Sequence, residues 1–161
     1  MIALVRVDNR LIHGQVVSTW IPHVKAGRVV VVDEEAATSP LMRAAMMMAL
    51  PPSLEAVIER PSVVDWASLS DGEVRTLVLV RDVADLELAL AAGLKTTAVN
   101  IGNVHFGDGR KAVTPSLFLS DAELEALGRI AASGIVIEAR AVPTDPGLGL
   151  EALRTLHEEA A

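Results

Sequence analysis

Cysteine is absent from this chain, tyrosine is absent too, and only two tryptophans and two phenylalanines occur among its 161 residues. Without cysteine the chain has no disulfides, thiolate metal sites or thiol catalysis, as is usual for a cytoplasmic protein. No apolar run approaches the roughly 20 residues that span a bilayer, and no basic segment followed by an apolar stretch opens the chain. We therefore expect a cytoplasmic protein.

Clusters of lysine and arginine are also missing, and the formal net charge is -7. A nucleic-acid-binding surface needs basic side chains to neutralise phosphates, and aromatic rings where bases stack. The composition therefore argues against a nucleic-acid partner. Proteins and small molecules remain as partners.

Apolar residues, in contrast, are abundant, at 51% of the chain. They are enough for one core, so we expect residues 1–161 to form a single domain. Short apolar runs alternate with helix-like segments, at residues 2–7, 29–32, 56–58, 77–80, 97–101 and 135–137. This rhythm predicts an α/β fold with an open, doubly wound, mainly parallel sheet, helices on both faces and an antiparallel edge near the C-terminus.

Residues with a capping mechanism mark where the predicted helices begin and end. The starts are Thr38 or Ser39 before Pro40, Asp82 before Val83, and Ser120 with Glu123 as a capping box. Gly27, Gly93 and Gly134 stand where helices need a left-handed stop. Residues 102–116 are predicted to be irregular, and His23 and His157 to lie on helix surfaces.

The break after the first strand carries the chemistry. Asp8 ends the apolar run, and an amphipathic helix is predicted from Gly14 to about residue 26, which places His13 at the helix N-terminus. Unpaired backbone N–H groups there favour an anion, and a neutral imidazole is a nucleophile. Arg10 offers a planar fork of donors suited to phosphate, and Asp8 can orient the guanidinium or the imidazole. The pattern suggests a histidine that accepts and passes on a phosphoryl group, with Gly14 and Gln15 as further phosphate contacts.

Loops after the other parallel strands should meet His13, because ligands bind at the carboxyl ends of such strands. They are residues 33–35, 81–82 and 100–106. Within them, Arg81 could bind the phosphoryl group as a second cation, or pair with Asp82 or Asp85. His13, His105 and Asp8 could together form a zinc site, but the paired short-spaced ligands of known zinc motifs are missing. Met46, Met47 and Met48 are expected to fill a core or pack at a partner surface.

The segment D-x-R-L-I-H-G-Q at residues 8–15 closely resembles the enzyme IIB component of the mannose/fructose/sorbose family of the bacterial phosphoenolpyruvate-dependent sugar phosphotransferase system (PTS). Nearly the whole chain takes part in the resemblance. Residues 28–33 resemble the family's second strand, 49–52 its proline-bounded connection, 97–102 its fifth strand and turn, and 134–140 and 144–146 its last strand and the start of its terminal helix.

The resemblance implies a phosphotransferase subunit that uses no metal or organic cofactor. In the family the motif histidine, here His13, takes the phosphoryl group from phosphorylated enzyme IIA, on Nδ1 by analogy. It delivers the group to a hexose held by the membrane IIC/IID components, on which a cytoplasmic IIB protein docks peripherally. The sugar and the oligomeric state do not follow from the resemblance.

Three residues depart from the family pattern: Asn9 replaces a commoner Asp, Asn103 a common second glycine, and Arg81 a small or polar residue. Two alternatives stay open at this point. One is a regulatory protein that is phosphorylated on His13 and signals through protein binding without transport. The other is a small-ligand or nucleotide-binding module, such as a receiver-like domain, although the third apolar run ends without the required aspartate.

Overall fold

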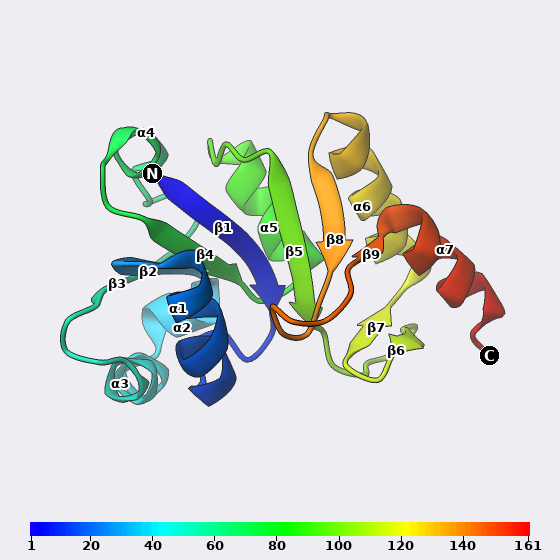
Figure 1. The fold of residues 1–161 in the computed structure, drawn as a ribbon, viewed down its shortest axis with the longest axis horizontal. Helices are drawn as coiled ribbons and strands as arrows, with labels where there is room; N and C mark the ends of the chain where they lie inside the picture. Colours follow the sequence, from blue (N-terminus) through cyan, green and yellow to red (C-terminus); the bar gives the residue numbers. More distant parts are fainter.

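A seven-stranded sheet runs through the computed structural model, which describes residues 1–161 (Figure 1). Its strands are β1 (Ile2–Asp8), β2 (Arg28–Val32), β3 (Glu55–Glu59), β4 (Thr76–Val80), β5 (Ala98–Asn103), β8 (Val136–Ala139) and β9 (Leu148–Gly149). The spatial order is β3-β2-β4-β1-β5-β8-β9. All pairs are parallel except β8 with β9, which is antiparallel. The predicted strands and the antiparallel edge near the C-terminus are confirmed.

Helices cover both faces of the sheet, as predicted. They are α1 (Ile21–Val24), α2 (Glu34–Thr38), α3 (Pro40–Ala49), α4 (Trp66–Asp71), α5 (Val83–Ala91), α6 (Asp121–Ala132) and α7 (Leu150–Glu159). None of them combines the length and apolar character that a bilayer crossing requires.

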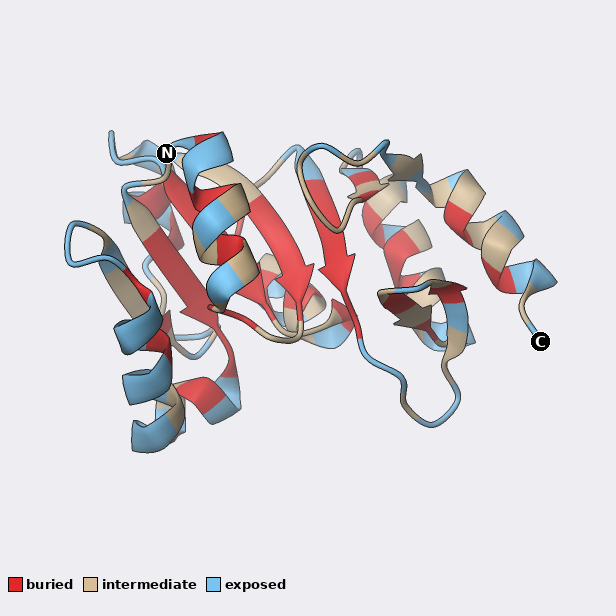
Figure 2. Ribbon diagram, turned by 60° about the horizontal axis from the view of Figure 1, so that its bottom comes forward, coloured by how far each residue is buried: buried red, intermediate tan, exposed pale blue.

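Alternate residues of the central strands feed two separate cores. Val29 and Val31 pack with the residues of α1, α2 and α3, whereas Val30 and Val32 pack with those of α4, α5 and α6. Successive side chains of a strand point to opposite faces, so a strand covered on both sides is apolar throughout. Figure 2 shows the consequence: the strands are buried, and exposed residues lie on the outer sides of the helices.

Most predicted helix boundaries are confirmed. Ser39, Asp82 and Ser120 cap α3, α5 and α6, the last with a complete capping box. Gly93 and Gly134 have positive φ angles. Gly27 does not: the left-handed residue after α1 is Lys25, with φ 52°. That prediction was wrong because the helix ends two residues earlier than the glycine suggests.

The segment predicted as irregular, residues 102–116, is partly regular: β5 runs to Asn103, and residues 111–114 form the first strand of a hairpin. Strands β6 (Lys111–Thr114) and β7 (Leu117–Leu119) pair antiparallel beside the main sheet. A second correction concerns His157, which is buried rather than on the surface because its Nε2 lies 3.1 Å from the carbonyl of Leu119. His23 is exposed, as expected.

The topology brings the loop after β1 to the middle of the carboxyl edge. β1 lies between β4 and β5, and the chain leaves it to build β2 on one side and later returns to build β5 on the other. This reversal of strand order is where open α/β sheets bind ligands.

Candidate phosphohistidine site

The loop after β1 is a tight turn anchored in the core. Leu11 has a left-handed backbone, φ 57°, and its N–H donates to the carbonyl of Asp8 at 2.9 Å. Leu11 and Ile12 are both buried beneath the loop. Burial of two leucine-sized side chains favours the turn despite the unusual φ angle. The turn places His13 at the sheet edge, directly before the helical residues that begin at Gly14.

Asp8 is the hub of the site. Its carboxylate is completely buried and accepts hydrogen bonds from the backbone N–H and Nε of Arg10, at 3.1 and 3.0 Å. Nη2 of Arg10 and Nη2 of Arg6 both donate to Oδ2, each at 3.0 Å. Two guanidinium groups therefore hold one carboxylate.

His13 meets the same carboxylate through one ring nitrogen. Its Nε2 lies 3.3 Å from Oδ2 of Asp8, and no protein group is hydrogen-bonded to Nδ1. The side chain of His13 is 18% exposed, so the ring is partly open to solvent. When Nε2 carries the proton toward Asp8, the lone pair of the neutral ring is on Nδ1. The arrangement can present Nδ1 as a nucleophile.

Hydrogen bonds and charges keep Asp8 ionised. Burial alone would raise the pKa of Asp8, but hydrogen bonds from His13 and Arg10 and the charges of Arg6 and Arg10 hold it well below its usual range. Burial also lowers the pKa of Arg6, against the charge of Asp8. A carboxylate that stays charged accepts a hydrogen bond from the N–H of Nε2 and so favours that tautomer of a neutral ring.

The helix after His13 begins at Gly14 and passes at Val16–Trp20 into a π-helical turn, which the sequence did not predict. Gln15 lies in the first turn, and its Oε1 accepts from Nη2 of Arg10 at 2.9 Å. Gln15 thus orients the arginine, whereas the sequence suggested a donor to phosphate. At Gly14 a Cβ would meet nothing within 4 Å, so the space above the helix N-terminus is open. A phosphate-binding role for Gly14 and Gln15 stays a prediction.

Arg81 lies at the rim of the site but is engaged elsewhere. Its Nε and Nη2 donate to the two carboxylate oxygens of Asp33, both at 2.7 Å. Its ion-pair partners are therefore Asp33 and, at 3.5 Å, Glu35, in place of the predicted Asp82 or Asp85. A small cavity of about 220 Å³ does link Arg81 to Arg10 and α3. A phosphate contact by Arg81 stays a prediction and would draw its guanidinium away from Asp33.

Asp85 contacts Asp33 of this ion pair, and its raised pKa predicts that the stability of the protein depends on pH. Burial, followed by the charge of Asp82 and the contact with Asp33, raises the pKa of Asp85 to about 7. Because this pKa is above the unfolded value of about 4, the folded state binds the extra proton, and its stabilisation is lost as pH rises between these values.

We therefore expect Asp85→Asn to flatten the fall in unfolding free energy between about pH 4 and pH 7, by about 1 kcal/mol after solvent screening of a half-exposed carboxyl. Urea unfolding of both proteins across this range measures the difference. Parallel curves for wild type and variant would contradict the assignment.

The loop after β5 closes the other side of the site. The N–H of Asn9 donates to the carbonyl of Asn103 at 2.9 Å, and the carboxamide of Asn9 lies 2.7 Å from Nδ1 of His105. His105 thus contacts Asn9 and not Asp8. No three potential ligands gather in a geometry that could hold a metal ion, so the zinc alternative gains no support.

The three consecutive methionines were expected either to fill a core or to pack at a partner surface. Met46 is buried with the core beneath α3, whereas Met47 and Met48 are exposed, Met48 by 87%.

Sequence reasoning missed Arg6 and the loop that follows β8. Arg6 is fully buried and donates to the carbonyls of Arg140 and Ala141 as well as to Asp8. A signal was available: Arg6 interrupts an apolar strand two residues before Asp8, so both side chains point to the same face. The carbonyl groups that complete its coordination have no signature in the sequence.

Comparison with known proteins shows the family to which this chain belongs. Residues 2–160 match the family described as "PTS system sorbose subfamily IIB component". The chain belongs to this family. The resemblance noted from the motif at residues 8–15 is confirmed, and this chain is a IIB component of a sugar-specific PTS.

Several relatives cover most of this IIB chain. It is 33% identical over 156 residues to the "PTS system mannose-specific EIIAB component" of Escherichia coli, a match of 92% of this chain and 46% of that protein. The chain thus spans about half the length of that relative. It is 27% identical to the "PTS system fructose-specific EIIB component" of Bacillus subtilis, covering 89% and 90% of the two chains.

Solved structures show the same fold. The IIB domain of the sorbose permease from Klebsiella pneumoniae superposes with a TM-score of 0.87 at 22% identity, covering 96% of this chain and 97% of that one. The N-acetylgalactosamine-specific IIB component 1 from Escherichia coli gives 0.84 at 26% identity, covering 91% and 97%. The α/β architecture is therefore that of the IIB family.

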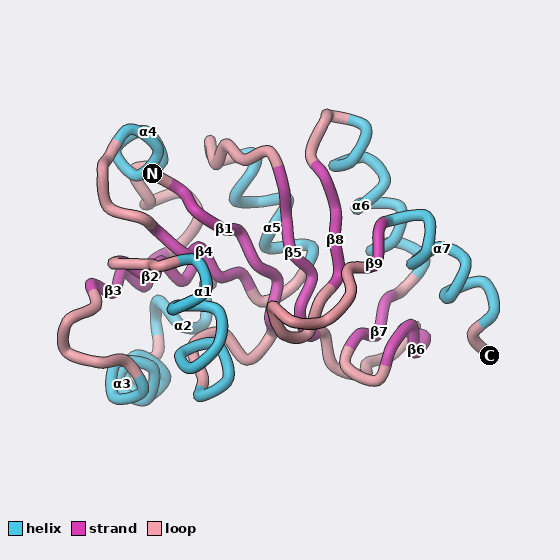
Figure 3. Tube along the Cα trace, in the orientation of Figure 1, coloured by secondary structure: helices cyan, strands magenta, loops and turns pink.

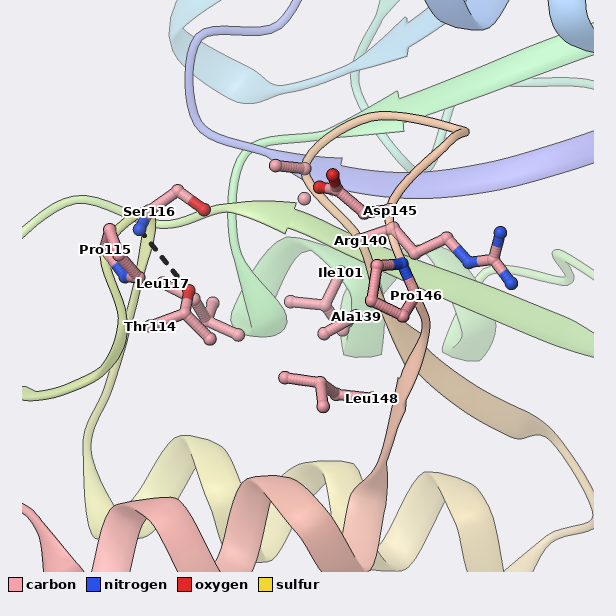
Figure 4. A pocket seen from close by; sticks show the side chains of 12 residues that line it. Ile101, Thr114, Pro115, Ser116, Leu117, Ala139, Arg140, Asp145, Pro146 and Leu148 are labelled. Atoms are coloured by element: carbon pink, nitrogen blue, oxygen red, sulfur yellow. Dashed lines mark hydrogen bonds between the residues drawn. The ribbon is translucent and has the colours of Figure 1, made fainter.

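A larger cavity of about 430 Å³ lies beside the site of this IIB component, between the carboxyl ends of β5 and β8 and the β6–β7 hairpin (Figure 4). Ile101, Leu117, Ala139 and Leu148 line it with apolar side chains. The guanidinium of Arg140, which also borders it, points away toward Glu138 and the carbonyl of Pro143. The cavity does not include His13, so its size does not make it the phosphoryl-transfer site.

Proposed function

We propose that this IIB component is a phosphocarrier that accepts a phosphoryl group on Nδ1 of His13 and passes it to a sugar. The contact between Nε2 of His13 and Oδ2 of Asp8, at 3.3 Å, carries the proposal. It fixes one ring nitrogen on a buried carboxylate and leaves Nδ1 of a partly exposed ring without a hydrogen-bond partner. A merely structural histidine would have no need of a free nitrogen at the sheet edge.

The transfer needs little covalent help from the protein. The lone pair of Nδ1 attacks phosphorus as the bond between phosphorus and the donor's imidazole breaks, and the donor ring keeps the electron pair of that bond. The transition state is loose, so positioning and charge compensation supply most of the catalysis. Arg10 uses Nε and Nη2 to hold Asp8. Its Nη1 remains to bind an oxygen of the incoming group.

The donor in this proposal is phosphorylated enzyme IIA, and the acceptor is a hexose bound by membrane IIC/IID components. A relative that carries an A and a B component under the name EIIAB supports a IIA donor. The protein would work in the cytoplasm and dock on the permease from that side. It uses no metal or organic cofactor in either step.

Reconstitution tests the proposal. Purified protein is incubated with phosphoenolpyruvate, enzyme I, HPr and a cognate IIA, and intact mass spectrometry follows the gain of one acid-labile phosphoryl group. We expect rapid, single phosphorylation that is discharged when membranes with the IIC/IID components and a hexose are added. Charging without discharge to any hexose would favour the regulatory alternative, and failure to charge beside a phosphorylated IIA would contradict a carrier role.

Arg10→Ala is expected to slow phosphoryl acceptance by about 100-fold or more while the protein stays folded, because removal of one donor that stabilises transition-state charge has an effect of this order. Single-turnover transfer from phosphorylated IIA gives the rate. Arg129→Ala is the control, since Arg129 is an exposed arginine that pairs with Glu87 on the outer helices. Charging of Arg10→Ala at the wild-type rate would refute this role.

A further inference from the structure

Arg6 is a buried cation whose contacts join three segments of the chain at the base of the site. Its Nη2 donates to Oδ2 of Asp8 and to the carbonyl of Ala141, both at 3.0 Å. Its Nη1 donates to the carbonyl of Arg140 at 2.9 Å and to the side chain of Asn100. Figure 3 shows the loop between β8 and β9 crossing the carboxyl end of β5 to reach β1.

The same guanidinium also supports the helix that follows His13. Its Cζ lies 4.6 Å from the centre of the Trp20 ring, a cation–π distance. Nε1 of Trp20 donates to the carbonyl of Ala141 at 3.1 Å, which Arg6 also binds. Arg6 is thus connected to His13 by two routes, through the carboxylate of Asp8 and through the helix that begins after the loop.

We propose that Arg6 is a positioning residue for phosphoryl transfer, which fixes the carboxylate of Asp8 from below and thereby selects the His13 tautomer with Nδ1 free. The proposal rests on the proposed role of His13. Arg6 does not touch the reacting atoms; it acts through Asp8.

Arg6 is better placed than Arg10 to do this throughout the reaction. The side chain of Arg10 is 32% exposed and faces the incoming group, whereas that of Arg6 has no exposure. Arg10 therefore divides its donors between Asp8 and the incoming phosphoryl group. Arg6 is tied to two backbone carbonyls, and its four Nη hydrogens are all engaged, so it holds Oδ2 of Asp8 in one place.

Only arginine satisfies all these acceptors at once. A lysine ammonium has three donors on a single nitrogen and lacks the planar fork, so it cannot reach Asp8, Asn100 and both carbonyls together. Gly102 lies against the guanidinium of Arg6, and a Cβ added at Gly102 would overlap that guanidinium. A single methyl group at Gly102 therefore displaces Arg6 without changing any polar group of the site.

Two variants test the proposal by independent means: Arg6→Lys keeps the charge and loses the fork, and Gly102→Ala keeps the fork and displaces it. Gly107→Ala is the matched control, since a Cβ there makes only ordinary contact, with its nearest neighbour at 3.5 Å. Leu127→Ala, on the buried face of α6, controls for lost stability alone. If one test variant does not unfold cooperatively, the other carries the test.

Heteronuclear NMR of the imidazole nitrogens at mildly alkaline pH gives the tautomer of unphosphorylated His13, and single-turnover charging by IIA gives the rate. We expect a single tautomer, protonated on Nε2, in wild type and both controls. Both test variants should show mixed tautomers and charging slowed by about 10- to 100-fold, as when an outer residue that orients an active group is lost.

Wild-type tautomer and rate in either folded test variant would overturn the proposal, as would slowing that matches Leu127→Ala at equal loss of stability. The tautomer is measured without phosphorylation, so it tests Arg6 even if the phosphocarrier role of His13 proves wrong.

Discussion

Replacing His13 with alanine is expected to abolish phosphorylation by IIA completely, with little loss of stability. No other side chain in the loop offers a nucleophile, because Arg10 is cationic and Asp8 is fully buried behind the histidine ring. His13 is partly exposed and its only side-chain hydrogen bond is to Asp8, which keeps Arg6 and Arg10 as partners in the variant. Intact mass spectrometry after incubation with the phosphorylated donor checks the expectation.

His23→Ala and His105→Ala are the matched controls. His23 is exposed on the same helical segment, and His105 lies beside Asn9 on the neighbouring loop. Both proteins should charge as wild type does. A phosphoryl group that persists in His13→Ala and disappears in His105→Ala would move the site to the loop after β5.

Asp8→Asn is expected to lower both stability and transfer. The change leaves the guanidinium of Arg6 buried without its counter-charge, for which a loss of about 3 to 5 kcal/mol in unfolding free energy is typical. It also places an amide where the carboxylate held Nε2 of His13, so the ring can present the wrong tautomer. Substitutions that misorient a catalytic histidine in this way slow reactions by up to about 10⁴-fold. Urea unfolding and single-turnover charging measure the two effects.

Glu123→Gln is the control that separates the general loss of an arginine-bound carboxylate from the loss of the contact with His13. Glu123 is also a carboxylate held by an arginine fork, that of Arg110, but it caps α6 and has no contact with His13. The control should lose stability and keep the wild-type charging rate. Charging by Asp8→Asn at the wild-type rate, corrected for the folded fraction, would rule out Asp8 as the residue that orients His13.

The parts of the fold that the sequence predicted are those with a local cause. Strand β2 reads as four valines because helices cover both of its faces, and α3, α5 and α6 begin at Ser39, Asp82 and Ser120 because those side chains bond the first free N–H groups. The motif at residues 8–15 likewise places the histidine, the arginine and the aspartate within one turn.

The parts that were missed depend on distant or backbone groups. The hydrogen bonds of Arg6 end on carbonyls more than 130 positions away, which any residue type could supply. The same holds for Arg81, whose partner Asp33 stands 48 positions earlier and was expected at the rim without being matched to it. The β6–β7 hairpin is short, and the glycines that precede it suggested irregular structure.

The most direct test of the account is to identify the ring nitrogen that carries phosphorus in the charged protein. Heteronuclear NMR of protein labelled in its histidine nitrogens, recorded under alkaline conditions where phosphohistidine persists, distinguishes the two isomers. The contact of Nε2 with Asp8 predicts a phosphoryl group on Nδ1 of His13 alone. Phosphorus on Nε2, or on another histidine, would contradict the central claim that Asp8 holds one nitrogen of the ring and leaves the other to react.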